Sequence, residues 1–158
     1  MLKSTGLYFI VTLVIMTFSS CSSPREVATI EPITIDNRFA FDFVKSSKLT
    51  AVLDKAEAEG KLVFLDVYTS WCLPCRMMDE NVFTNETTAS IINKDFVSYK
   101  VDAEKANGPD LAMIYEIKSY PTLLFLDPRG RVLERKEGAT YHTELVALAD
   151  KARGKYPQ

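Results

Sequence analysis

The chain has 158 residues, of which 47% are hydrophobic and 25% are charged, the composition of an ordinary globular protein. This length allows one domain plus a leader, and such a domain can bury a core without disulfide cross-links. The formal net charge of −2 gives no support to nucleic-acid binding, and three cysteines with one histidine are too few for a multi-disulfide scaffold or a closed zinc site.

The first twenty residues have the pattern of an export signal. Lys3 supplies positive charge ahead of an apolar run over 7–18 (LYFIVTLVIMTF), and Ser19 and Ser20 follow it. A spanning helix needs about 20 apolar residues, so this run is short for that role and fits the apolar region of a signal peptide. We therefore expect residues 1–20 to be a signal peptide.

Cys21 gives this leader a more specific interpretation. The stretch Phe18-Ser19-Ser20-Cys21 resembles the lipobox of bacterial lipoproteins, although that family prefers Leu at the Phe18 position. The resemblance implies that Cys21 is acylated, becomes the first residue of the mature protein and anchors it stably to a membrane. The alternatives are ordinary cleavage near Ser20, which leaves Cys21 as a spare thiol, and an uncleaved anchor.

The segment after the leader has the composition of a linker. Residues 21–42 lack a sustained helical period and contain Pro24 and Pro32. We expect them to hold the lipid attachment site and a tether, with a short strand near Ile33 to Ile35. The folded domain is then expected over 43–158.

Helical and strand patterns alternate through this domain. Leu62 to Tyr68 (LVFLDVY) is apolar on both alternating faces, which is typical of a central strand covered on both sides. Strand–helix–strand segments imply parallel pairing, and a turn at 127–130 implies a hairpin. We therefore expect an α/β fold with a mixed central sheet of about four to five strands flanked by helices. The other expected elements are helices near 49–56, from 76, over 85–92, near 111–115 and near 145–152, and strands over 96–101, 122–126 and 131–136.

Cys72 and Cys75 lie where the expected central strand gives way to a helix. At a helix start, free backbone N–H groups and the helix dipole favour an anion, which lowers the pKa of the Cys72 thiol and supplies a thiolate. Cys75 follows one turn later, within reach of Cys72, and can resolve a mixed disulfide by intramolecular attack. Pro74 fits the first helical turn, because its missing N–H costs little there.

Two separated motifs, Trp71-Cys72-Leu73-Pro74-Cys75 and Tyr120-Pro121-Thr122, closely resemble those of the thioredoxin superfamily. The stretch 66–72 also resembles the C-terminal domains of periplasmic thiol:disulfide interchange proteins. The resemblance implies a thioredoxin-like fold and thiol–disulfide exchange through Cys72 and Cys75. Family members have Gly-Pro between the cysteines more often than Leu73-Pro74, which leaves the redox potential open.

The resemblance also implies how a client is bound. Pro121 should be cis and pack beside the two sulfur atoms, and the backbone of Tyr120 should pair with the client chain. Trp71, Leu73 and Pro74 would complete the contact surface. X–Pro bonds are cis in only about 5–6% of folded cases, and the alternative is a trans proline that starts an edge strand.

Asp66 and Lys100 are the remaining candidate site residues. Asp66 interrupts an otherwise apolar strand before Cys72, and burial of a carboxylate raises its pKa. In the family, the acid at this position helps to move the proton of the resolving cysteine, here Cys75, and a lysine can lie near it, here Lys100. The alternatives are that Asp66 lies at a solvent-facing strand end and that Lys100 is a surface charge.

Taken together, these features favour a redox enzyme of the bacterial envelope that faces the periplasm. It would exchange disulfides with protein clients as a reductant, and a membrane electron donor would recharge it. The same Cys-x-x-Cys dithiol could instead serve a disulfide oxidant or isomerase, a module that handles a soft metal such as Cu(I), or a structural clasp in a binding module. We expect no cofactor, because the cysteines are themselves the redox group, and a monomer is the family default.

Overall fold

The computed structural model describes residues 33–156, and a mixed sheet of six strands lies at their centre. The strands are β1 (Thr34–Ile35), β2 (Phe43–Lys45), β3 (Leu62–Tyr68), β4 (Phe96–Asp102), β5 (Thr122–Leu126) and β6 (Val132–Glu137). They lie in the order β1-β2-β4-β3-β5-β6, with β4 parallel to both β2 and β3 and the other three pairs antiparallel. Strand β3, which leads to the two cysteines, is therefore internal to the sheet.

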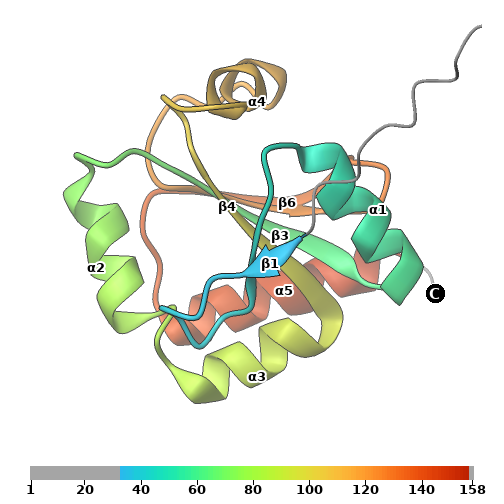
Figure 1. Cartoon of the computed structure of the whole chain (residues 1–158). Coiled ribbons are helices and arrows are strands. Elements are labelled where there is room, and N and C mark those ends of the chain that lie inside the picture. The colour runs from blue at the N-terminus through green and yellow to red at the C-terminus, as the bar shows by residue number, and fades with distance from the viewer. Residues whose placement is uncertain (1–32, 157–158) are drawn as a thin grey trace, which may run out of the picture. The chain divides into compact units, whose positions relative to one another are not determined.

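Helices cover both faces of this sheet. Helices α3 and α5 lie side by side on one face, where α2 also packs, whereas α1 and α4 pack on the other face (Figure 1). Within residues 33–156, none of the helices is both long and apolar enough to cross a membrane. The helices are α1 (Leu49–Glu59), α2 (Leu73–Asn81), α3 (Glu86–Asp95), α4 (Gly108–Ile114) and α5 (His142–Lys155).

The alternation of side chains along β3 divides the core into two layers. Phe64 points toward α3 and α5, where its ring lies 5.2 Å from that of Phe125 and 6.1 Å from that of Phe83. Leu65 points into the opposite layer beneath α1. Both side chains are fully buried, and truncating a buried ring such as Phe64 costs about 3–5 kcal/mol. This packing on both faces holds β3, and hence the start of α2, in a fixed position.

The observed order of elements confirms the α/β fold expected from the sequence, with two differences. The sheet has six strands instead of four to five: β1 confirms the short strand expected near Ile33 to Ile35, and β2 is additional, because its three residues are too few for an alternating pattern to be visible. Helix α2 begins at Leu73, not at Arg76, since Cys72 caps it and Pro74 lies in its first turn.

The two edges of the sheet differ in length. Strand β1 has two residues, whereas β6 has six, and four consecutive side chains of β6, Glu134 to Glu137, are charged. Arg135 of β6 donates hydrogen bonds to the carbonyl oxygens of Tyr115 and Glu116, at 2.7 and 2.9 Å. These bonds satisfy carbonyl groups at the C-terminal end of α4 and fix the chain that leads to Pro121.

Candidate active site

Cys72 and Cys75 form a disulfide at the N-terminus of α2, just beyond the carboxyl end of β3. The sulfur atoms are 2.05 Å apart and the Cα atoms 5.3 Å apart. The backbone N–H of Cys75 donates a hydrogen bond to Sγ of Cys72 at 3.2 Å, so Cys72 is the N-cap residue of the helix. The pair is therefore covalently joined, and the Cys72 sulfur lies where the helix N-terminus stabilises negative charge.

The surroundings of the disulfide are apolar and exposed, although the cysteines themselves are buried. Trp71 is 65% exposed and Leu73 is 59% exposed, whereas Cys72 is 4% exposed. The indole N–H of Trp71 donates a hydrogen bond to Glu104 at 3.0 Å, and its ring meets that of Tyr120 edge-on at 5.9 Å. Trp71 therefore lies on the exposed surface and not in the core.

The Tyr120–Pro121 peptide bond is cis, as predicted. The Trp71–Tyr120 ring contact brings this bond's loop against the loop that carries the cysteines. The carbonyl oxygen of Pro121 accepts a hydrogen bond from the backbone N–H of Gly138 at 2.8 Å, which ties the loop to the chain between β6 and α5. The structure thus brings together the two motifs that lie about 45 residues apart in the sequence.

Asp66 and Lys100 form an ion pair inside the domain. They are direct register partners on the parallel strands β3 and β4, so their side chains share one face of the sheet. The Asp66 side chain is 1% exposed and that of Lys100 is 9% exposed, so neither is at a solvent-facing strand end or on the surface. The Lys100 ammonium group also lies 4.0 Å from the centre of the Tyr68 ring, a favourable cation–π contact.

Asp79 is a third member of this cluster that the sequence analysis missed. Its Oδ1 lies 2.9 Å from Nζ of Lys100, and its side chain is 27% exposed. Asp79 follows Cys75 by four residues on α2, and residues with this spacing share a helix face. That spacing was visible in the sequence and could have placed Asp79 on the helix face of Cys75, but not its contact with Lys100.

Burial and the neighbouring charges have opposite effects on the pKa values of Asp66 and Lys100. Burial raises the pKa of Asp66 above its ordinary value, and the nearby Lys100 offsets this only in part. Burial also disfavours the charged form of Lys100, but the carboxylates of Asp66 and Asp79 outweigh that effect and raise its pKa. Lys100 therefore stays charged, while Asp66 takes up a proton more readily than an exposed carboxylate. The Oδ1 atom of Asp66 has no hydrogen-bond partner among residues 33–156 and is free to accept one.

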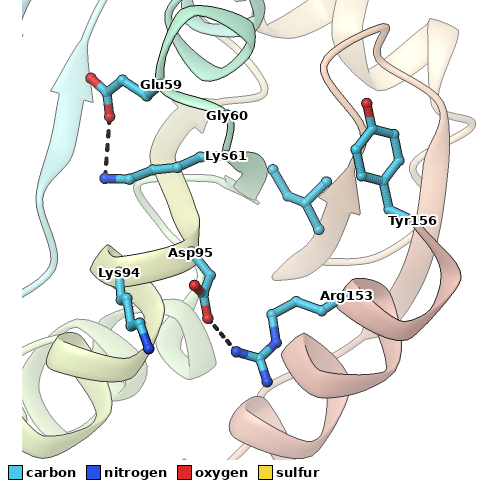
Figure 2. A pocket seen from close by; sticks show the side chains of 8 residues that line it. Glu59, Gly60, Lys61, Lys94, Asp95, Arg153 and Tyr156 are labelled. Atoms are coloured by element: carbon cyan, nitrogen blue, oxygen red, sulfur yellow. Dashed lines mark hydrogen bonds and ion pairs between the residues drawn. The ribbon is translucent and has the colours of Figure 1, made fainter. Parts of the chain in front are cut away.

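A second charged region lies at the other end of β3. A pocket there has a volume of about 110 Å³. In it Lys61 pairs with Glu59 and Arg153 pairs with Asp95, while Lys94 also lines it (Figure 2). The pocket lies at the amino end of β3, away from the disulfide. Within the described range, no group of three or more His, Cys, Asp or Glu residues could hold a metal ion. Cys21, the expected lipidation site, lies outside the described residues.

The dithiol at the start of α2, the cis proline before β5 and the mixed sheet between them define a thioredoxin-like thiol–disulfide oxidoreductase domain. A family model named Thioredox_DsbH, described as "Protein of unknown function, DUF255", matches residues 44–133. The chain belongs to this family.

Similar proteins agree with this class. The thiol:disulfide interchange protein DsbD of Pseudomonas fluorescens is 34% identical over 94 residues, which are 58% of this chain but 16% of that protein. A thioredoxin of Mycoplasmoides gallisepticum is 32% identical over 62% of this chain and 91% of its own. The solution structure of a "putative disulphide-isomerase" from Bacteroides thetaiotaomicron matches with a TM-score of 0.63 and 32% identity, over 80% of this chain and 99% of that one. The chain thus corresponds to a small part of DsbD and to nearly all of the two smaller proteins.

Proposed function

We propose that the chain reduces disulfide bonds of protein clients in the bacterial cell envelope. The observation that carries this proposal is the Cys72–Cys75 disulfide at the N-terminus of α2, next to the exposed side chains of Trp71 and Leu73. An exposed apolar surface around a reactive sulfur suits a partner that is itself a polypeptide. The backbone of Tyr120, before the cis proline, would pair with the client chain, and Pro74 would extend the contact surface.

The exchange proceeds in two steps that together transfer two electrons. In the reduced protein, the Cys72 thiolate attacks one sulfur of the client disulfide, a mixed disulfide forms, and the other client sulfur leaves as a thiolate that takes up a proton. Cys75 then loses its proton and attacks Sγ of Cys72. The second client thiol is released, and the Cys72–Cys75 disulfide is formed. A dithiol donor in the membrane must reduce it again.

Asp66 and Lys100 would handle the proton of Cys75. Asp66 accepts this proton, through an intervening water molecule, because its raised pKa lies nearer to that of a thiol than the pKa of an exposed carboxylate does. Lys100 holds the Asp66 carboxylate in place and stabilises its charged form. A pocket of about 240 Å³ that is lined by Lys100 and Tyr68 gives the cluster a route to solvent.

The charges near the dithiol favour the reducing direction. A strong oxidant is one whose reduced, thiolate form is stabilised. Here the two residues between the cysteines are uncharged, and the single positive charge of Lys100 is already paired with Asp66 and Asp79. The Cys72 thiolate is then stabilised by the helix N-terminus and by Arg76, which directly follows Cys75 on α2. We expect this stabilisation to be moderate, as in a reductant of the thioredoxin kind.

The redox potential of the Cys72–Cys75 pair tests both the activity and its direction. We would equilibrate the purified protein with glutathione or thioredoxin buffers and follow the fluorescence of Trp71. A potential near about −270 mV is expected for a reductant, and one near about −120 mV would reverse the proposed direction. Replacement of Cys72 by Ser should lower insulin reduction by at least about 100-fold, since it removes the nucleophile. An unchanged rate would mean that the disulfide is only a structural clasp.

The place of action depends on the leader. We propose that residues 1–20 direct export, that Cys21 carries the lipid and that 21–42 tether the domain to a membrane. Two acyl chains give stable anchoring where one does not. Labelling of cells with a fatty-acid analogue should mark the wild-type chain and not a Cys21→Ala variant. Equal labelling of both chains, or none of either, would contradict lipidation at Cys21.

A further inference from the structure

An apolar groove lies beside the candidate active site, between α2 and the chain that enters α5. Its volume is about 410 Å³. Met78 and Val82 form a buried floor, while Met77 is 51% exposed and Tyr141 is 78% exposed at the two rims. His142 also lines the groove, but its Nδ1 is hydrogen-bonded to Thr88 at 3.1 Å, so that side of the ring is already satisfied. The groove therefore offers mainly apolar contacts, with a methionine that can adapt to different shapes.

Both walls of the groove continue from elements of the candidate active site. On α2, Met77 lies one turn beyond Leu73 on the same helix face, and Leu73 directly follows Cys72. On the other wall, Ala139 follows Gly138, whose N–H is bound to the carbonyl oxygen of Pro121. A client chain that reaches Cys72 next to Pro121 is thus already at the mouth of the groove.

The spacing fits an extended chain. Met77 follows Cys72 by five residues, which is about 7.5 Å along a helix axis. Two residues of an extended chain span about 6.7 Å, and side chains two residues apart point to the same side. For a client chain that runs along α2, a cysteine that points at Cys72 has a neighbour, two residues away, that reaches Met77 at the groove.

We infer that this groove binds a large apolar side chain of the client, two residues from its reactive cysteine. The inference rests on the proposed function and adds a sequence preference to it. Burial of this side chain against Met78 and Val82 holds the client while the sulfur atoms exchange. Clients with a leucine or phenylalanine at this distance react faster than clients with a serine there.

Four peptides test the preference. Each contains one cysteine in a disulfide with glutathione, and Leu or Ser stands two residues before or two residues after it. The rate of reduction by the reduced full-length protein is measured for each. We expect the Leu peptide to exceed its Ser counterpart by about tenfold in at least one of the two positions, a gain that burial of a leucine side chain can supply. Equal rates in both positions would overturn the inference.

Two variants and a second substrate, insulin, test whether the Leu preference arises in the groove. Met77→Lys places a charge at one rim and Tyr141→Ser opens the other, and each should reduce the Leu preference at least threefold. Met113→Lys is the matched control, since Met113 is a 79% exposed methionine on α4 that does not line the groove, and it should keep the full preference. Equal loss in all three variants would contradict a role of the groove. Insulin separates the two proposals: failure to reduce it at all refutes the proposed function, whereas its reduction without a Leu preference among the peptides refutes only the groove.

Discussion

Two clusters of ion pairs lie at opposite ends of β3, and their residue types are alike. Near the carboxyl end, Lys100 contacts Asp66 and Asp79, and near the amino end Lys61 pairs with Glu59 while Arg153 pairs with Asp95. The side chains of Lys100 and Asp66 are almost inaccessible, whereas those of the second cluster are 21% to 42% exposed. The comparison shows that burial, and not the identity of the partners, sets the free energy lost when an ion pair is broken and whether the pKa of its acid is raised.

In the buried cluster, water is excluded, so each charge is stabilised mainly by the opposite charges beside it. In the exposed cluster, water and salt ions compete with the partners. Only the first kind of environment shifts an acid upward in pKa and makes it useful for proton transfer near neutral pH. The predictions below test this difference by changing one cluster and using the other as its control.

The largest effect is expected from Lys100→Met. This change leaves the buried carboxylate of Asp66 and the partly exposed carboxylate of Asp79 without this cation, and loss of one partner from a buried pair costs about 3–5 kcal/mol of the free energy of unfolding. Lys61→Met is the matched control, since Lys61 also contacts a carboxylate and a backbone oxygen but is more exposed, and it should cost less than about 1 kcal/mol. Urea unfolding of the two variants measures both values. Similar losses would remove the distinction between the clusters.

The second prediction concerns how the contributions of Asp66 and Glu59 to the free energy of unfolding change with pH. Burial raises the pKa of Asp66 above 3.8, so the folded state keeps a proton that the unfolded state has lost. That contribution to stability is present below pH 3.8 and is lost as the pH rises through the folded-state pKa. Hydrogen bonding to Lys55 lowers the pKa of Glu59 below 4.5, so its contribution is present above pH 4.5 and is lost as the pH falls through the folded-state pKa.

The contribution of each carboxyl group is isolated by subtracting the free energy of unfolding of its variant from that of the wild type at each pH. The stability of the wild type relative to Asp66→Asn should fall as the pH rises from 4, by at most about 1.4 kcal/mol per pH unit. Relative to Glu59→Gln it should rise over the acid range, with a smaller slope because water screens Glu59. Slopes of the same sign would contradict the assigned pKa directions.

The smallest effect is expected from salt. Arg153→Met removes the pair with Asp95 and should cost less than about 1 kcal/mol at low ionic strength. In 1 M salt the Debye length falls to about 3 Å, so this cost should largely vanish, whereas the cost of Lys100→Met should persist. Thermal unfolding at two salt concentrations measures both, and a salt-independent cost of Arg153→Met would show that packing of its stem matters more than its charge.

The same contrast explains what the sequence could predict. The buried position of Asp66 followed from its place in the apolar strand LVFLDVY, and the dithiol from a short motif at a strand-to-helix junction. The cis proline was predicted only from the resemblance to the thioredoxin superfamily. Asp79 did not, because its contact with Lys100 joins a helix to a strand 21 residues later, and such contacts depend on packing. Strand β2 was missed because three residues carry no period, and the groove beside α2 was missed because its walls are distant in sequence.

The charged side chains of β6 have a consequence for the proposed exchange with polypeptide clients. A free sheet edge is a template on which any extended polypeptide can add a strand, and charges along an edge oppose this. Four charged residues in succession, Glu134 to Glu137, oppose strand addition at the edge formed by β6. The other edge, β1, has only two residues. Under the proposed function, these charges keep extended clients from adding to the sheet and favour their alignment on the backbone of Tyr120. The same charges would oppose aggregation of the domain with its clients.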